Sequence, residues 1–181
     1  MNTTERNIER AKQGSEVAWR DLLEPLQAPV TAYLARFVQP SDALDIAQET
    51  WVRVIRSIHQ FEGRSSFKSW VFRIAYRQML NHQKRKPKTD SLAVDVAGED
   101  AAIETKLEQV EAQSQLLECV DRLPEHQRQV VWLRLSEGLT FREIAEVLDA
   151  PLNTILGRMH QAKQQLTKAM IKKGIITGAA T

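Results

Sequence analysis

The sequence predicts an all-α fold in which two small helical domains are joined by a flexible acidic linker. Apolar residues recur at intervals of three and four, and the 181 residues include only seven Gly and few β-branched runs. Charge divides the chain, because residues 1–88 carry a net charge of +6, residues 89–121 one of −8 and residues 122–181 one of +4. We therefore expect domains at 1–88 and 106–175, with the linker at 89–105.

Helices are expected from the apolar periodicity and from residues that start or stop helices. They lie near residues 4–13, 15–37, 42–59, 66–86, 105–120, 124–136, 141–149 and 153–172. Pro124 suits the first position of a helix, where its missing N–H leaves no hydrogen bond unmade. Thr140 and Glu143 form a T-x-x-E capping box, and Asn153 is a candidate N-cap for the last helix.

Composition argues against several classes of protein. No stretch approaches the roughly 20 apolar residues that span a bilayer, and the polar N-terminus lacks a signal-peptide core. We therefore expect a cytoplasmic protein with no stable membrane insertion. The single cysteine, Cys119, is expected to be a small core residue, because it has no partner for a disulfide or a metal knuckle. Without a catalytic triad, phosphate loop or metal-binding spacing, we expect no enzyme activity, cofactor or metal.

The helix expected from Asp42 has an apolar side and a charged side. At 100° per residue, the apolar side holds Leu44, Ala47, Trp51, Val54, Ile55 and Ile58. The charged side holds Asp42, Asp45, Glu49, Val52, Arg53 and Arg56. A charged helix face is commonly only solvated. Here, however, acids at i, i+3 and i+7 beside an exposed Val52 also suit docking of a partner helix rich in arginine.

The next segment, FEGRSSFKSWVFRIAYRQMLNHQKRK, combines aromatic and basic residues. The helix within it has two apolar strips: Phe67, Val71 and Ile74 on one side, and Phe72, Tyr76 and Met79 nearly opposite. A third strip is basic and consists of Arg73, Arg77 and Lys84, with Asn81 beside it. Basic residues interleaved with aromatic rings suit single-stranded DNA, and the loop Phe61–Ser66 is a candidate cradle for an unstacked base. Alternatively, Phe67, Trp70 and Ile74 are simply core residues.

The last two expected helices have the pattern of a helix-turn-helix. Their buried stripes are Phe141, Ile144, Ala145 and Leu148, then Ile155, Met159, Ala162 and Leu166, separated by the short turn Asp149-Ala150-Pro151. Opposite the second stripe lie Thr154, Gly157, His160, Gln161 and Gln164, flanked by Arg158 and Lys163. Glutamine can bind base edges and the cations can bind phosphates. The alternative is a surface helix that packs on another protein.

In this order, the segments make residues 16–172 resemble an extracytoplasmic-function (ECF) sigma factor of the bacterial sigma-70 family. DALDIAQETWVRVIRSI resembles the segment that binds core RNA polymerase. The basic and aromatic segment resembles the one that melts the promoter and recognises its −10 element. LPEHQRQVVWLRLSEGLTFREIAEVLDAPLNTILGRMHQAKQQL resembles the domain that binds the −35 element.

The resemblance implies three sets of binding residues. Those expected to dock on the β′ clamp helices of core RNA polymerase are Asp42, Asp45, Gln48 and Glu49. Those expected to bind the −10 element and capture a flipped base are Phe61, Arg64, Ser65, Arg73, Arg77, Asn81, Lys84 and Arg85. Those expected in the −35 major groove are Thr154, Gly157, Arg158, His160, Gln161 and Lys163. The polymerase β flap, promoter DNA and an anti-sigma factor are the other expected partners.

This chain departs from the family pattern in its last helix. Leu156 stands where a lysine is frequent, and Gln161 where an arginine is frequent. Because phosphate contacts supply much of the affinity for DNA, we expect −35 binding to be weaker or differently specified.

The function implied is that of a dissociable transcription initiation subunit, with the chemistry left to the polymerase. Two alternatives stay open from the residues alone. A dimeric helix-turn-helix repressor or activator would bind a palindromic site tightly without polymerase, although a ligand-sensing domain has no need of the basic and aromatic strip. A helical adaptor that binds only protein would show no crosslinking to DNA.

Overall fold

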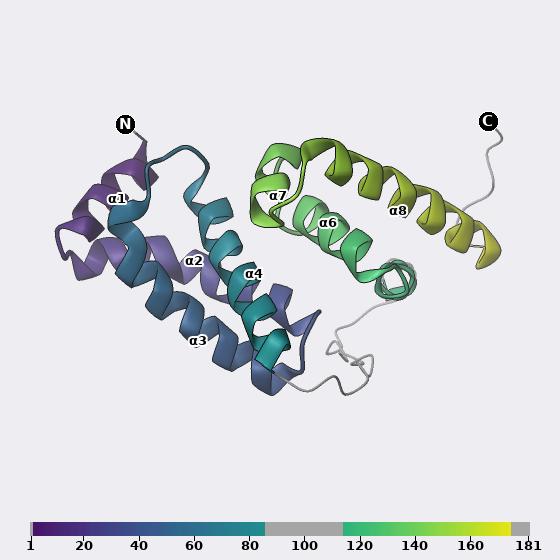
Figure 1. Cartoon of the computed structure of the whole chain (residues 1–181), viewed down its shortest axis with the longest axis horizontal. Coiled ribbons are helices and arrows are strands. Elements are labelled where there is room, and N and C mark those ends of the chain that lie inside the picture. Colours follow the sequence, from purple (N-terminus) through teal and green to yellow (C-terminus); the bar gives the residue numbers. More distant parts are fainter. Residues whose placement is uncertain (1, 86–113, 175–181) are drawn as a thin grey trace, which may run out of the picture. The chain divides into compact units, whose positions relative to one another are not determined.

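The computed structural model describes residues 2–85 and 114–174, and Figure 1 shows their helices coloured along the chain. Within these ranges the regular secondary structure is helical and includes no strand, as the sequence predicts. None of the helices described there has the length and apolar character needed to cross a membrane. The linker expected at 89–105 lies outside these ranges.

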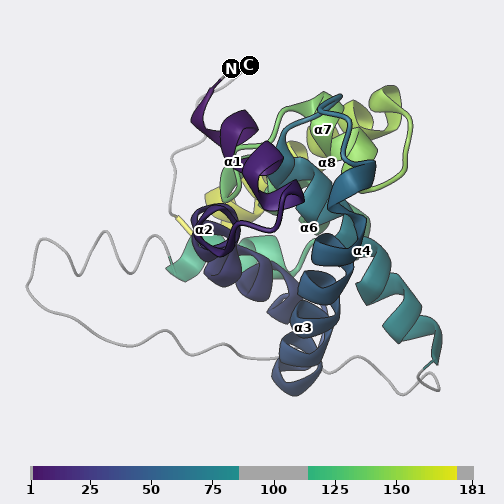
Figure 2. The same ribbon diagram turned by 90° about the vertical axis from the view of Figure 1, so that its left-hand side faces the viewer.

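By their contacts, the described residues form two compact units, one of 2–85 with 142–149 and one of 114–141 with 150–174. Residues 2–85 form four α-helices and one 3₁₀ turn, and these elements are α1 (Thr3–Lys12), α2 (Glu16–Ala35), α3 (Pro40–Ser57), η1 (Ile58–Gln60) and α4 (Phe67–Arg85). α1 packs on α2, α2 on α3, and α3 on α4, so that α3 and α4 lie side by side in Figure 1 and Figure 2.

The buried face of α3 differs from the one predicted. Its members are mostly small or polar: Ala43, Ile46, Ala47, Thr50, Val54 and Ser57. Leu44 and Ile55, which we expected to be buried, are 57% and 48% exposed. Small side chains let neighbouring helices approach closely, and the hydroxyls of Thr50 and Ser57 donate to carbonyls of their own helix at 2.7 and 2.6 Å. The prediction for Leu44 and Ile55 is therefore wrong, and these apolar side chains face solvent.

Helix α4 has buried residues on more than one side, as its two apolar strips predict. They are Phe67, Ser69, Val71, Phe72, Ala75 and Met79. The ring of Phe72 meets that of Tyr33 from α2 edge to face at 5.5 Å between centroids, a geometry that aromatic pairs favour. Ile74 and Tyr76, which were assigned to the strips, are only partly buried.

The second unit has its own apolar core. Its helices are residues 114–121, α6 (Glu125–Leu135) and α8 (Leu152–Lys172). Helix α7 (Phe141–Val147) lies between α6 and α8 in the sequence, but its residues from 142 on are grouped with the first unit. The core cluster consists of Val120, Leu123, Val131 and Ala162, with Leu116, Met159 and Leu166 packed against it. Cys119 is buried, and so is Ile155 of the predicted α8 stripe. Both predictions are confirmed.

Two helix starts differ from the predictions. Pro124 is the N-cap of α6, one residue before its first helical position. Asn153 is not a cap, because α8 already begins at Leu152 after the extended Pro151, and no side chain caps it. The turn before Pro151 is confirmed and rests on Asp149, whose φ of 50° lies in the left-handed region that residues other than glycine seldom occupy.

Candidate nucleic-acid interface

A cleft of about 420 Å³ lies between α3 and α4. Its lining residues are Arg53, Ser57, Gln60, Trp70, Arg73, Ile74, Arg77, Gln78 and Asn81. Three of these carry guanidinium groups, three carry carboxamides, and none is acidic. The cleft therefore offers several hydrogen-bond donors and a positive potential to an anionic ligand.

The cleft brings together part of the basic strip predicted on α4. Arg73, Arg77 and Asn81 line it, whereas Lys84 and Arg85 are exposed further along the same helix. The Nε atom of Arg73 is buried and has no hydrogen-bond partner among the residues that the structure describes. Such a donor is ready to bind a ligand atom that enters the cleft.

Arg53 is a cleft residue that the sequence did not indicate. It belongs to α3, and its charge placed it on the predicted docking face of that helix. Because the buried face of α3 differs from the one predicted, Arg53 lines the same cleft as Arg73 and Arg77. Only the packing of α3 against α4 reveals this, because the three arginines follow no common helical period.

The loop before α4 stands on an aromatic cluster. The Phe61 ring lies 5.7 Å from that of Phe67 and 5.3 Å from that of Trp70, and only 8% of Phe61 is exposed. The Nζ of Lys12 donates to the Phe61 carbonyl at 3.4 Å. Phe61 thus anchors the start of the loop to the aromatic cluster and offers little exposed ring surface to a base.

The rest of this loop reaches solvent. Gly63 turns the chain with a φ of 72°, and Arg64 is exposed beside Glu62, with Nε and Oε2 2.7 Å apart. Ser65 is partly buried, and the Oγ of Ser66 accepts from the backbone N–H of Ser69 at 3.2 Å, which caps the start of α4. Arg64 and Ser65 are therefore the predicted loop residues whose side chains can reach a ligand.

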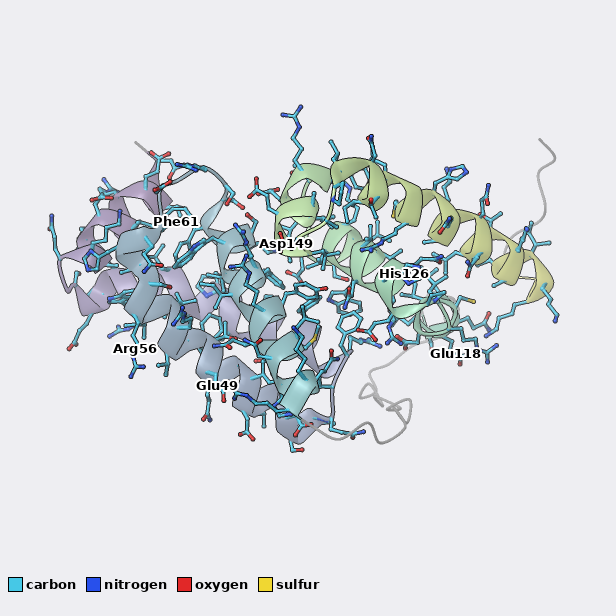
Figure 3. The ribbon with its side chains drawn as sticks, viewed as in Figure 1. Glu49, Arg56, Phe61, Glu118, His126 and Asp149 are labelled. Atoms are coloured by element: carbon cyan, nitrogen blue, oxygen red, sulfur yellow. The ribbon has the colours of Figure 1, made fainter. Side chains whose placement is uncertain are left out.

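The predicted polymerase-docking residues on α3 fall into two groups. Asp45, Gln48 and Glu49 are exposed, and Figure 3 shows the labelled Glu49 projecting from α3 away from the other helices. Asp42 is mostly buried, with 14% of its side chain exposed, and its Oδ2 lies 3.4 Å from the Nε2 of His82 on α4. Asp42 therefore also joins the two helices, whereas the other three are available to a partner.

Exposed apolar residues surround these acids. Leu44, Val52 and Ile55 are each about half exposed or more. The expectation of an exposed Val52 beside the acids is thus confirmed, and the face is wider than predicted. A face that mixes carboxylates with large apolar side chains is typical of a protein-binding surface.

The predicted −35 residues lie along one helix, α8, and four of the six share a pocket. A shallow, open pocket of about 510 Å³ is lined by His126, Thr154, Gly157, Arg158 and Gln161. A Cβ built on Gly157 would meet nothing within 4 Å, so its neighbours do not require a glycine there. The missing side chain leaves the backbone of α8 open to a close approach.

The other two predicted −35 residues are exposed outside the pocket. His160 lies beside Gln164, with 2.9 Å between their Nε2 atoms, and Lys163 is exposed. His126 is the pocket residue that the sequence did not indicate, because it belongs to α6 rather than α8.

Comparison with known proteins identifies the family. The Sigma-70 region 2 model matches residues 22–89, and the Sigma-70 region 4 model matches residues 113–166. The ECF RNA polymerase sigma-E factor of Haemophilus influenzae is 30% identical, across 88% of this chain and 90% of the relative. The RNA polymerase sigma-H factor of Pseudomonas aeruginosa is also 30% identical, across 90% of this chain and 91% of the relative.

Two solved structures share the fold. CnrH in complex with the cytosolic domain of CnrY matches with a TM-score of 0.65 and 20% identity, covering 93% of this chain and 97% of CnrH. The sigma factor RpoE of Bartonella quintana, in complex with the anti-sigma factor NepR, matches with a TM-score of 0.64 and 17% identity, covering 83% of this chain and 97% of RpoE. With region 2 and region 4 in order and ECF relatives along most of its length, this chain belongs to the ECF sigma factors of the sigma-70 family.

Proposed function

We propose that this sigma factor opens promoters by holding the single-stranded −10 element in the arginine cleft between α3 and α4. The observation that supports this most is the convergence of Arg53, Arg73 and Arg77 from two helices on one cleft. Guanidinium groups at several points of a groove can bind successive phosphates, and the Trp70 ring in the same lining can contact a base. The loop with Arg64 and Ser65 then holds a base outside the duplex.

Docking on core RNA polymerase is assigned to the exposed face of α3. Asp45 and Glu49 supply negative charge on that face, and Leu44, Val52 and Ile55 supply apolar surface beside it. An arginine-rich helix pair such as the β′ clamp complements both features, because its cations pair with the carboxylates while its alkyl stems cover the apolar side chains.

Recognition of the −35 element is assigned to the exposed face of α8. Arg158 supplies a phosphate contact, and Thr154 and Gln161 supply polar contacts to base edges. Leu156 is 42% exposed and adds no charge, so this face has fewer phosphate contacts than one with a lysine there. We therefore expect the isolated chain to bind promoter DNA weakly. Core polymerase holds both DNA-binding modules at once, so that two weak contacts act together through effective concentration.

Run-off transcription with core enzyme tests the assignment of the cleft. Arg77→Ala and Arg53→Ala should each reduce initiation on a duplex promoter. Each should also make the decline of log activity with log salt concentration shallower, by about one unit of slope, because one phosphate contact is lost. On a template already melted across the −10 element, the loss should be smaller. Arg20→Ala, which removes the same charge from exposed α2 outside the cleft, is the matched control. Equal losses in all three variants would contradict the assignment.

Tight binding without polymerase would favour the dimeric repressor instead. That function requires the isolated chain to bind a palindromic duplex and to gain nothing from core enzyme. An electrophoretic mobility-shift assay of the chain on such a duplex, with and without core enzyme, therefore separates the two functions.

An anti-sigma partner is also proposed. RpoE of Bartonella quintana, which shares the fold, is in complex with the anti-sigma factor NepR. A protein that covers the exposed face of α3 would block docking on the polymerase, and Leu44, Val52 and Ile55 provide the apolar surface that such a partner would bury.

A further inference from the structure

We infer that Gln127, a buried residue of α6, sets the direction in which Gln161 of α8 hydrogen-bonds to DNA. In this arrangement the Gln161 carboxamide keeps its oxygen toward the protein and presents its N–H groups to the base edge. The −35 position that Gln161 contacts should then favour a base with acceptors in the major groove, guanine above all. This inference rests on the proposed placement of α8 in the −35 major groove.

The contact joins two helices that pack on each other. The Nε2 of Gln127 donates to the Oε1 of Gln161 at 3.3 Å. Gln127 is only 3% exposed, whereas Gln161 is exposed and lines the open pocket together with His126. Figure 3 labels His126 on α6, beside α8. A buried, packed side chain therefore holds one end of a side chain whose other end reaches solvent.

The donor in this pair is assigned by burial. The Oε1 of Gln127 is buried and has no hydrogen-bond partner among the described residues. If both carboxamides were turned over, the buried group without a partner would be an NH₂ instead. Buried N–H groups without partners are rarer in proteins than carbonyls that lack one, because each carbonyl has two lone pairs and tolerates partial satisfaction. Gln127 is therefore the donor and Gln161 the acceptor.

The consequence concerns which base Gln161 can recognise. A free glutamine pairs with adenine through both ends, since its oxygen accepts from N6 and its nitrogen donates to N7. In Gln161 the oxygen faces Gln127, so the bidentate pairing with adenine requires breaking that hydrogen bond. Donation from the nitrogen alone is retained, and guanine offers two acceptors, O6 and N7, for it. Cytosine offers only a donor and is disfavoured.

Transcription by the holoenzyme on a set of promoters tests this, with each of the four bases placed in turn at every −35 position. Gln161→Ala first identifies the position that Gln161 contacts, because the base preference there should collapse. If no position loses its preference, the placement of α8 in the groove fails, and the proposed −35 contact fails with it.

The second variant tests Gln127 itself. Gln127→Met keeps the size of the side chain but cannot donate a hydrogen bond to Gln161. The ratio of activity with guanine to activity with adenine at that −35 position should therefore fall roughly fivefold or more, which is the equivalent of one net hydrogen bond. Gln129→Met is the matched control, because Gln129 is equally buried on α6 but donates to Glu125 in its own helix at 3.2 Å.

Two outcomes would overturn the inference. In one, Gln127→Met leaves the guanine-to-adenine ratio unchanged although Gln161→Ala removes it. In the other, Gln127→Met lowers activity on all four bases by the same factor, as Gln129→Met would if both residues served only the stability of α6. A lowered guanine-to-adenine ratio in Gln127→Met but not in Gln129→Met supports the inference, since a merely structural role would not alter base preference.

Discussion

Lys12 on α1 donates a hydrogen bond from its Nζ to the backbone carbonyl of Phe61, 3.4 Å away, and so joins the first helix to the start of the proposed base-capturing loop. α1 also packs against η1, which directly precedes that loop. Both contacts come from a helix that ends before residue 22, where the match to the Sigma-70 region 2 model begins. The loop is therefore supported by a part of the chain outside that match.

Replacing Lys12 should weaken promoter opening. Lys12→Met keeps the alkyl chain but removes the donor, and a hydrogen bond contributes about 1 kcal/mol, so opening should fall by up to roughly fivefold. Lys12→Arg should retain most of the opening. Permanganate reactivity of −10 thymines in holoenzyme complexes measures the effect. On a template already melted across the −10 element, Lys12→Met should initiate run-off transcription as well as the wild type. A loss of initiation that persists on this template would count against a role in the loop.

The exposed acids of α3 should be required for core binding. Asp45→Arg and Glu49→Lys reverse charges on the exposed face without disturbing a buried contact, so each should abolish capture of core enzyme in a pull-down while melting temperature stays near that of the wild type. Glu24→Lys makes the same change on exposed α2 and serves as the control. Unchanged capture in the α3 variants would remove this face from the polymerase interface.

Asp42 should behave differently from those acids. Because it is mostly buried and lies 3.4 Å from His82, Asp42→Asn should lower the stability of the first unit by about 0.5–1 kcal/mol. A double-mutant cycle with His82→Gln, followed by urea denaturation, measures the coupling directly. Additive effects of the two substitutions would show that the pair contributes nothing to stability.

The buried face of a helix can be predicted from the sequence only where the residues on that face are the helix's large apolar ones. The buried stripe of α8 follows its apolar residues, such as Ile155, and there periodicity and structure agree. On α3 the core face contains Thr50 and Ser57, while Leu44 and Ile55 are exposed. Hydrophobicity marks residues that avoid water, but it does not separate those buried in the fold from those that a partner would cover.

The site residues that the sequence did not indicate all depend on contacts between helices. Arg53 reaches the cleft through the packing of α3 on α4, and His126 and Gln127 lie on α6 but contribute to a surface of α8. Residues on one helix share a period that can be recognised in sequence. Pairs from two helices depend on interhelical packing, which a single sequence does not specify.

Lys173 should stabilise the end of α8 in a manner that depends on pH. Its Nζ lies 2.6 Å from the Oε2 of Glu118, and this hydrogen bond and the lysine charge lower the pKa of Glu118 below its usual 4.5. A lowered pKa in the folded state means that the stabilisation is complete above pH 4.5 and is lost as the pH falls through the folded value. Lys173→Met should therefore melt below the wild type at pH 7 and match it well below pH 4.5. In a chain that already carries Glu118→Gln, adding Lys173→Met should leave the melting temperature unchanged at every pH.

Asp149 tests the turn before α8. Because its φ is 50°, a β-branched residue is strained there, and Asp149→Val should destabilise the chain by about 1–2 kcal/mol. Asp149→Asn should be nearly neutral, since asparagine tolerates the left-handed region as aspartate does. Asp149→Gly should also stay within about 0.5 kcal/mol, because the relief of strain is offset by greater freedom in the unfolded chain. Urea denaturation gives the free energy of unfolding of the three variants. A valine variant as stable as the glycine variant would contradict the left-handed conformation of Asp149.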